Sequence, residues 1–268
     1  MKRYHRLLSL VLSFSLFLTV FSFTAQASEN SIDDFLLSKG VSQEIINILP
    51  DGQKLLIYET LEDTATFASF DAQIVTLENE NSLNNTEGSE SAGGIEAMSG
   101  MIPTSSLTFT VVAFDLTVNG QPQTAIYPSF IWSDPQYMNN DSFSMALYPG
   151  WDVVPGKCNL RLYKKYIGSQ STHLEYDFQP ILSTSNGYSY KIPSNHESTW
   201  FVPYVNEGHS GFNAIKTNPN ATRAISLNYV QDTSSFFYAS YTVSILGLSI
   251  GVSGSTSSLN YMSGNFGF

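Results

Sequence analysis

The sequence has one cysteine and few positive charges, and both scarcities exclude whole classes of protein. Because Cys158 is alone, no disulfide can form within the chain, and stability must come from packing. The 268 residues hold 12 Lys and Arg against 23 Asp and Glu, a formal net charge of −11. A nucleic-acid-binding surface needs a basic field, so we expect no nucleic-acid partner.

Long apolar runs are also scarce. The single one, residues 7–23, follows a basic cluster that begins at Lys2, and it precedes the small-x-small pattern at Ala25 to Ala27. This order predicts a secretory signal peptide over residues 1–27, cleaved near Ala27, and a secreted, extracellular protein. No later stretch reaches the ~18 apolar residues that a transmembrane helix needs, so the sequence predicts none after residue 27.

Acidic residues are concentrated near the N-terminus. Residues 29–96 contain 14 of the 23 acidic residues but two of the basic ones. The beginning of this region has the pattern of short helices, with Gly40 placed to end the first and Ser42 to cap the second. Residues 62–76 fit a strand or a helical extension equally. We expect a small acidic helical segment over residues 28–76.

Residues 77–103 have few apolar side chains. Glu, Asn, Ser and Gly dominate this stretch. Such a composition cannot bury enough surface to offset the conformational entropy of the chain. The sequence therefore predicts a disordered linker here, which leaves residues 104–268 as the body of the protein.

The body has the period of two that is typical of half-buried strands. Leu107, Phe109, Val111 and Ala113 share one parity, and Asn119-Gly120 is a strong signal for a two-residue hairpin. The strand-like runs are 104–119, 124–132, 142–148, 158–166, 172–178, 188–192, 199–205, 224–230, 236–245, 246–252 and 259–268. About ten short strands divided by turn residues predict a mainly β fold, an antiparallel β-sandwich or an irregular barrel.

One short motif raises the question of catalysis. Residues 247–251 match G-x-S-x-G, the nucleophile elbow of α/β-hydrolases, with Ser249 as the nucleophile. An elbow requires a sharp turn from strand to helix, whereas apolar residues here simply alternate with Gly and Ser from 246 to 253. No His follows His209 to complete a triad in that order. We expect an ordinary strand and no catalytic residue.

Other sequence signals for metal or cofactor chemistry are weak. His196-Glu197 begins a zinc motif, but Trp200 stands where the second His is required. We interpret residues 207–211 as a Gly-rich turn with His209 exposed at its tip. The sequence predicts no metal site and no cofactor.

Aromatic residues in or beside loops are the candidate ligand-binding residues. Exposed rings on a β scaffold can stack on sugars or anchor a protein partner. Large rings can equally well fill a sandwich core, and the sequence does not decide between these interpretations. The candidates are Trp132, Tyr137, Trp151, Trp200 and Tyr204.

Basic residues of the body cluster in one run. Lys157, Arg161 and Lys165 would share one face of a strand. The stripe is either a solvated face that discourages edge pairing or the contact surface for the acidic segment, which would then be an intramolecular cover.

The sequence favours a secreted, non-catalytic β-sandwich that binds a glycan or a cell-surface protein, without membrane insertion. One alternative is a membrane-active, pore-forming-like protein, because the alternation over 246–253 is also that of a transmembrane strand. Another is a secreted hydrolase with a carboxylate pair. The carboxylates available for that pair are Asp134, Asp152, Glu175, Asp177, Glu197 and Glu207.

Overall fold

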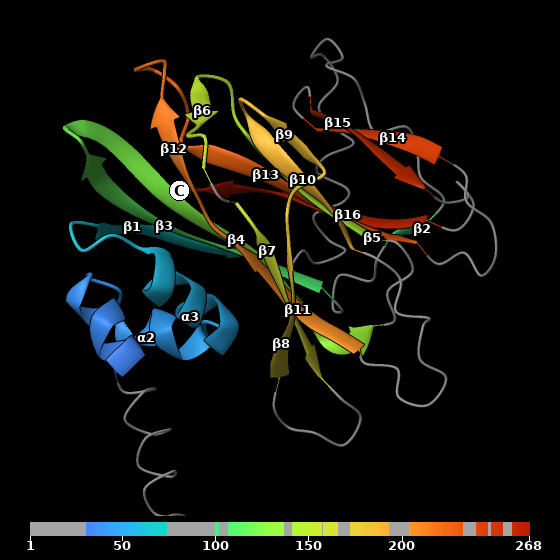
Figure 1. Ribbon diagram of the computed structural model, residues 1–268, viewed down its shortest axis with the longest axis horizontal. Coiled ribbons are helices and arrows are strands. Elements are labelled where there is room, and N and C mark those ends of the chain that lie inside the picture. Colours follow the sequence, from blue (N-terminus) through green and yellow to red (C-terminus); the bar gives the residue numbers. More distant parts are fainter. Residues whose placement is uncertain are drawn as a thin grey trace, which may run out of the picture.

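The computed structural model describes residues 31–73, 100–101, 107–136, 141–156, 158–165, 172–192, 204–232, 240–245, 248–253 and 259–268. Two mostly antiparallel sheets pack face to face, and short helices pack against one of them (Figure 1). The prediction of a mainly β sandwich preceded by a small helical segment is confirmed. The signal peptide lies outside the described residues and stays a prediction.

The first sheet, sheet A, contains eight strands. Its order is β1 (Thr66–Gln73), β3 (Leu107–Val118), β4 (Gln121–Gln136), β11 (Tyr204–Ser210), β7 (Leu160–Lys165) and β8 (Thr172–Phe178). In addition, β12 (Phe212–Lys216) pairs with β4, and β6 (Trp151–Val153) pairs with β12.

The second sheet, sheet B, contains six strands, and a hairpin stands apart from both sheets. The order in sheet B is β2 (Gly100–Met101), β16 (Leu259–Gly267), β13 (Ala224–Asp232), β5 (Asp141–Leu147), β10 (Gly187–Ile192) and β9 (Leu182–Thr184). The hairpin joins β14 (Ser240–Ile245) to β15 (Leu248–Ser253).

Sheets A and B enclose an aromatic-rich core. The predicted inward parity of β3 is correct, because Leu107, Phe109, Val111 and Ala113 are all fully buried in this core. The ring of Phe109 stacks on that of Phe143 in β5, with 6.2 Å between the ring centroids. This contact joins the inner faces of the two sheets.

The turn at Asn119-Gly120 is as the sequence predicts. Val118 pairs with Gln121, which leaves a two-residue loop between β3 and β4. Asn119 has a φ of 50° and Gly120 a φ of 80°. Two consecutive positive φ values are what a tight hairpin turn requires, and Asn and Gly are the residues that tolerate them.

The helices pack on the outer face of sheet A. Residues 31–38, α2 (Gln43–Ile48) and α3 (Asp51–Thr60) are helical. Gly40 has a φ of 93°, and the Ser42 side chain accepts a hydrogen bond from the backbone N–H of Ile45, as predicted for a helix end and a helix cap. The apolar cluster between helices and sheet includes Leu36, Ile46, Leu56, Ile57, Val112, Phe114, Leu116, Ala125 and Tyr127.

The stretch 62–76, which the sequence leaves open, contains strand β1. It pairs with β3 and so joins the helical segment to sheet A. It also contacts sheet B, because Gln73 Nε2 donates to Asn265 O at 2.6 Å and Gly267 N donates to Asp71 Oδ2 at 3.1 Å.

Strand β2, inside the predicted linker, pairs in parallel with β16. Among the described residues, no helix has the length and apolar character to cross a membrane.

The interpretation of residues 207–211 as an exposed turn is wrong. Glu207, Gly208 and His209 belong to β11, and His209 has no exposed surface. A Cβ added to Gly208 would lie 2.4 Å from Cε1 of Phe130, a core residue. The glycine therefore permits close packing inside a sheet rather than a turn. Strand β12, which begins at Phe212, is also absent from the predicted strands, because the sequence indicates a turn just before it.

Candidate functional site

The β14–β15 hairpin contains the G-x-S-x-G motif. Ser249 lies within β15, opposite Ser244 of β14. The prediction that this serine belongs to an ordinary strand, and not to a nucleophile elbow, is confirmed. Leu246 and Gly247, which join the two strands, lie outside the described residues.

The register of the hairpin sorts its residues onto two faces. The apolar pairs are Tyr241 with Val252, Val243 with Ile250, and Ile245 with Leu248; the small or polar pairs are Ser240 with Ser253, Thr242 with Gly251, and Ser244 with Ser249. Cross-strand partners lie on the same face of an antiparallel ladder, and successive residues lie on opposite faces. The hairpin therefore has one apolar face and one face of small polar residues.

The hairpin lies in an uncharged part of the sequence. No Asp, Glu, Lys, Arg or His occurs in residues 233–268. Moving a charge into an apolar medium costs far more than moving a serine hydroxyl. The hairpin therefore has no ionised side chain that would oppose its transfer out of water.

The position of the hairpin follows from the pairing of β5. Cα atoms of β15 come within 8 Å of those of β5 and β10. Strand β5 already pairs with β13 on one side and β10 on the other, so a strand that approaches it without pairing lies over a face of sheet B. The inner face packs on sheet A, which leaves the outer face for the hairpin. Packed sheets are usually ~10 Å apart, so this approach requires small side chains.

The outer face of sheet B has such side chains. Ser142, Ser144, Ala146 and Ser189, which we call the serine cradle, are buried. The hydroxyls of Ser144 and Ser189 are 3.4 Å apart, and Ser142 Oγ has no hydrogen-bond partner among the described residues. Small side chains with long or missing hydrogen bonds stabilise a contact weakly.

The five candidate ligand-binding aromatics do not form one exposed surface in the described part of the chain. Trp132 is 2% exposed, and its ring centroid lies 5.3 Å from that of Tyr229 in the core. Trp151 is 4% exposed and packs edge-on against Phe268 at 5.0 Å. Tyr204 begins β11. Tyr137 and Trp200 lie outside the described residues.

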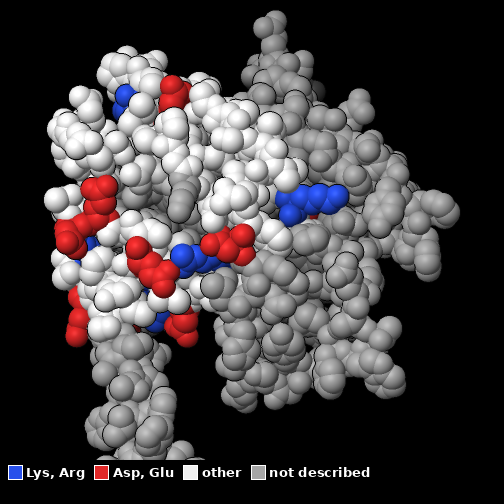
Figure 2. All heavy atoms as spheres, in the orientation of Figure 1, with Lys and Arg blue, Asp and Glu red and all other residues white. Residues whose placement is uncertain are grey.

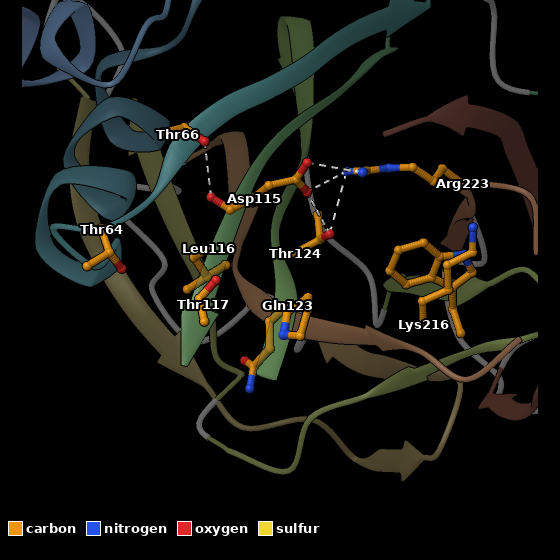
Figure 3. Close-up of a pocket in the computed structure, with 11 residues that line it drawn as sticks. Thr64, Thr66, Asp115, Leu116, Thr117, Gln123, Thr124, Lys216 and Arg223 are labelled. Carbon is orange, nitrogen blue, oxygen red and sulfur yellow. Dashed lines mark hydrogen bonds and ion pairs between the residues drawn. The ribbon is translucent and has the colours of Figure 1, made fainter. Parts of the chain in front are cut away.

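Trp151 also lines a cavity of about 500 Å³ beside Arg223 and Asp115 (Figure 3). The two charged groups form a bidentate pair, with Nη2–Oδ1 at 2.8 Å and Nη1–Oδ2 at 3.1 Å. Burial alone would raise the pKa of Asp115, but hydrogen bonds from Arg223 and Thr124 outweigh burial, and the pKa is lowered. The carboxylate is therefore held in its charged form.

Arg161 of the basic stripe contacts the acidic helical segment. Its Nη1 lies 2.6 Å from Oε2 of Glu59 on α3. Burial by itself would lower the pKa of Arg161, and the bond to Glu59 raises it overall. Figure 2 shows several acidic side chains gathered over the helices on this face. Lys165 lies in β7 opposite Tyr204, and Lys157 lies outside the described residues.

The carboxylates considered for a hydrolase are dispersed. Asp177 pairs in register with Arg161, and Asp152 with Ile215, whereas Asp134 and Glu175 lie in β4 and β8. Glu197 lies outside the described residues. Within the described ranges, no group of three or more His, Cys, Asp and Glu is placed to hold a metal ion.

Glu207 and His209 form a buried polar group that the sequence did not reveal. His209 Nε2 lies 3.7 Å from Glu207 Oε1, and His209 Nδ1 lies 2.9 Å from Ser129 Oγ. Helix α3 covers this group, since a Cβ at Gly52 would lie 2.8 Å from the His209 ring. Its surroundings are protein on all sides, which is the environment of a structural contact and not of an open site.

No protein-family model matches this sequence, and no curated protein matches it. Among solved structures, a chain described as "Pore forming protein" aligns with a TM-score of 0.34 and 12% sequence identity, over 60% of this chain and 86% of that chain. A similarity of this degree establishes neither a family nor a function.

Proposed function

We propose that this protein is a secreted, membrane-active β protein whose β14–β15 hairpin enters lipid bilayers. The observation that carries the proposal is the hairpin register, in which apolar pairs alternate with small or polar pairs along both strands. Transmembrane β-strands alternate in this way, with apolar residues toward lipid and polar residues toward water. The uncharged sequence around the hairpin supports the same function.

Insertion requires several copies of the protein. A lone hairpin in lipid would leave backbone N–H and C=O groups unpaired along both outer edges, at several kcal/mol for each group. If each copy contributes one hairpin, every edge is paired by a neighbour. Assembly and insertion are therefore coupled.

The strands of the hairpin are shorter than transmembrane strands, so insertion requires that they extend. Each strand has six residues, or about 20 Å at ~3.3 Å per residue. A transmembrane strand needs ~9–11 residues. Residues 233–239 and 254–258, which flank the hairpin and carry no charge, supply the additional sequence.

The test compares one lysine substitution on each face of the hairpin. Wild-type protein should release a dye from vesicles of phosphatidylcholine and phosphatidylserine. Ile250→Lys places the charge on the apolar face, where it costs about 2–4 kcal/mol per inserted strand near the bilayer centre, so leakage should fall at least tenfold. Ser249→Lys makes the same change in charge on the polar face and should retain leakage.

The two variants are matched because the positions are adjacent in one strand. Circular dichroism and melting temperature should confirm that both fold like the wild type. Absence of leakage by the folded wild-type protein, with or without anionic lipid, would refute the proposal. Equal loss in both variants would show that the two faces do not have different roles.

The alternative function, binding of a glycan or protein through exposed aromatic rings, loses support because Trp132 is buried in the core. A hydrolase needs a pair of carboxylates, and the described candidates are spread over several strands, with Asp152 in β6, Asp177 in β8 and Glu207 in β11. Neither alternative explains the two-faced register of the hairpin.

A further inference from the structure

The cavity beside Trp151 lies where the two sheets and the helical segment meet. It is lined by Thr64, Thr66, Asp115, Leu116, Thr117, Pro122, Gln123, Thr124, Trp151, Lys216 and Arg223. These residues come from the α3–β1 connection, the start of β1, the β3–β4 hairpin, β6, β12 and the residue before β13. In Figure 1 the C-terminus, which neighbours Arg223, lies on the left, and the β14–β15 hairpin lies at the upper right.

One wall of the cavity is fixed in position. Arg223 is held by its bidentate pair with Asp115 and donates from Nε to Phe268 O at 2.6 Å. Thr124 Oγ1 donates to Asp115 Oδ1 at 2.9 Å. The carboxylate and guanidinium neutralise each other, and Figure 3 shows them side by side above Thr124. Their positions are set before any ligand arrives, which lowers the entropic cost of binding.

Other residues of the lining have polar groups that remain available. Within the described part of the chain Lys216 has no carboxylate partner, and its Nζ lies 5.8 Å from the centre of the Trp151 ring. Gln123 Oε1 accepts from Asn213 Nδ2 at 3.0 Å, which leaves its own amide N–H groups free to donate. Thr64 and Thr117 add hydroxyls to the lining. With Asp115 and Arg223 paired, Lys216 gives the cavity one net positive charge.

We propose that this cavity binds a polyhydroxylated ring that carries one anionic group. A volume of about 500 Å³ is within the usual range for small-molecule sites and accommodates one or two sugar-sized rings. The hydroxyls and the Gln123 amide suit ring hydroxyls, Leu116 and Pro122 supply apolar surface, and Lys216 suits a carboxylate or phosphate. Acidic saccharides and inositol phosphate headgroups share this chemistry. The inference does not depend on membrane insertion.

The test measures binding of three probes to the full-length protein by isothermal titration calorimetry. 3′-Sialyllactose represents acidic saccharides, inositol 1-phosphate represents lipid headgroups, and lactose is the neutral reference. At least one anionic probe should bind at least tenfold more tightly than lactose. The stronger anionic probe identifies the source of the ligand.

Substitutions assign the binding to the cavity. Lys216→Gln removes the positive charge and keeps a polar side chain, and it should weaken binding of the anionic probe about tenfold, the loss expected for one charge-assisted hydrogen bond, without affecting lactose. Lys191→Gln, at an exposed position on β10, is the control and should bind like the wild type. Failure of both anionic probes to bind, or binding that is equal in wild type and Lys216→Gln, would overturn the proposal. Leakage by the same samples is a separate measurement, so the two proposals can fail independently.

Discussion

Gln53 of α3 is the side chain that most directly tests how the helices are attached to the β fold. It is fully buried between the helix and sheet A. Its Nε2 donates to Tyr127 O at 2.9 Å, and its Oε1 accepts from Thr110 Oγ1 at 3.1 Å. Gln53→Met keeps the volume and removes both bonds.

The expected loss follows from these two contacts. A buried polar group left without its partner costs about 1–3 kcal/mol, and the added apolar surface of Met offsets part of the total. We expect the free energy of unfolding to fall by about 2 kcal/mol. In a chain of this length that corresponds to a melting temperature lower by roughly 4–8 °C. Denaturant unfolding should be followed by far-UV circular dichroism and by tryptophan fluorescence, and both midpoints should shift together.

A double-mutant cycle isolates the bond to Thr110. Thr110→Val alone should cost about 1 kcal/mol, and added to Gln53→Met it should cost almost nothing more, because the acceptor is already absent. Two outcomes would refute the reasoning. One is an unchanged midpoint for Gln53→Met, and the other is loss of helix at low denaturant while the sheet signal persists. The first would show that the two hydrogen bonds add no net stability, and the second that the helices unfold as a separate unit.

Two further predictions concern stability. Burial raises the pKa of Cys158 from 9.0 to about 11. The neutral buried thiol should therefore contribute fully to the free energy of unfolding below the pKa of the unfolded thiol, and this contribution should be lost as the pH rises toward 11. Urea midpoints measured across this range check the prediction, and a flat profile contradicts it. Gly208→Ala should lower the free energy of unfolding by about 1–3 kcal/mol, since the new Cβ would meet the Phe130 ring at 2.4 Å. Gly267→Ala, with nothing within 4 Å, is the matched control and should leave the thermal midpoint unchanged.

The sandwich could be predicted from the sequence because its strands obey local rules. The alternation over Leu107 to Ala113 separates the residues of β3 that face sheet B from their neighbours, and Asn119-Gly120 fixes the turn that follows. Ser42 and Gly40 mark helix ends by equally local chemistry. Each of these signals depends on a few neighbouring residues and on no distant contact.

The predicted strand 199–205 overlaps β11 at Tyr204 and Val205, but the rest of β11 and all of β12 could not be predicted because their burial depends on distant parts of the chain. Glu207 and His209 read as exposed polar residues, yet α3 covers them from more than a hundred residues away in sequence. Gly208 reads as a turn residue, although its role is to make room for Phe130. Local composition contains neither fact.

The candidate site falls between these two cases. The alternation over 246–253 is visible in the sequence, but one strand alone is weak grounds for a membrane function. What the sequence lacks is the register, which places the apolar residues Tyr241 and Val243 opposite Val252 and Ile250. Pairing turns one alternating strand into a hairpin with two distinct faces.

The two faces of sheet B suggest how a hairpin could leave a protein that stays folded. On the inner face, Phe143 and Met145 are fully buried, and burial of each such side chain contributes about 1.5–3 kcal/mol. On the outer face, the serine cradle offers a hairpin little apolar surface and few hydrogen bonds. A contact with these side chains therefore costs far less to break than the contact between the two sheets. Under the proposed function, the sandwich would remain intact while the β14–β15 hairpin leaves sheet B for lipid, in which its apolar residues are better solvated.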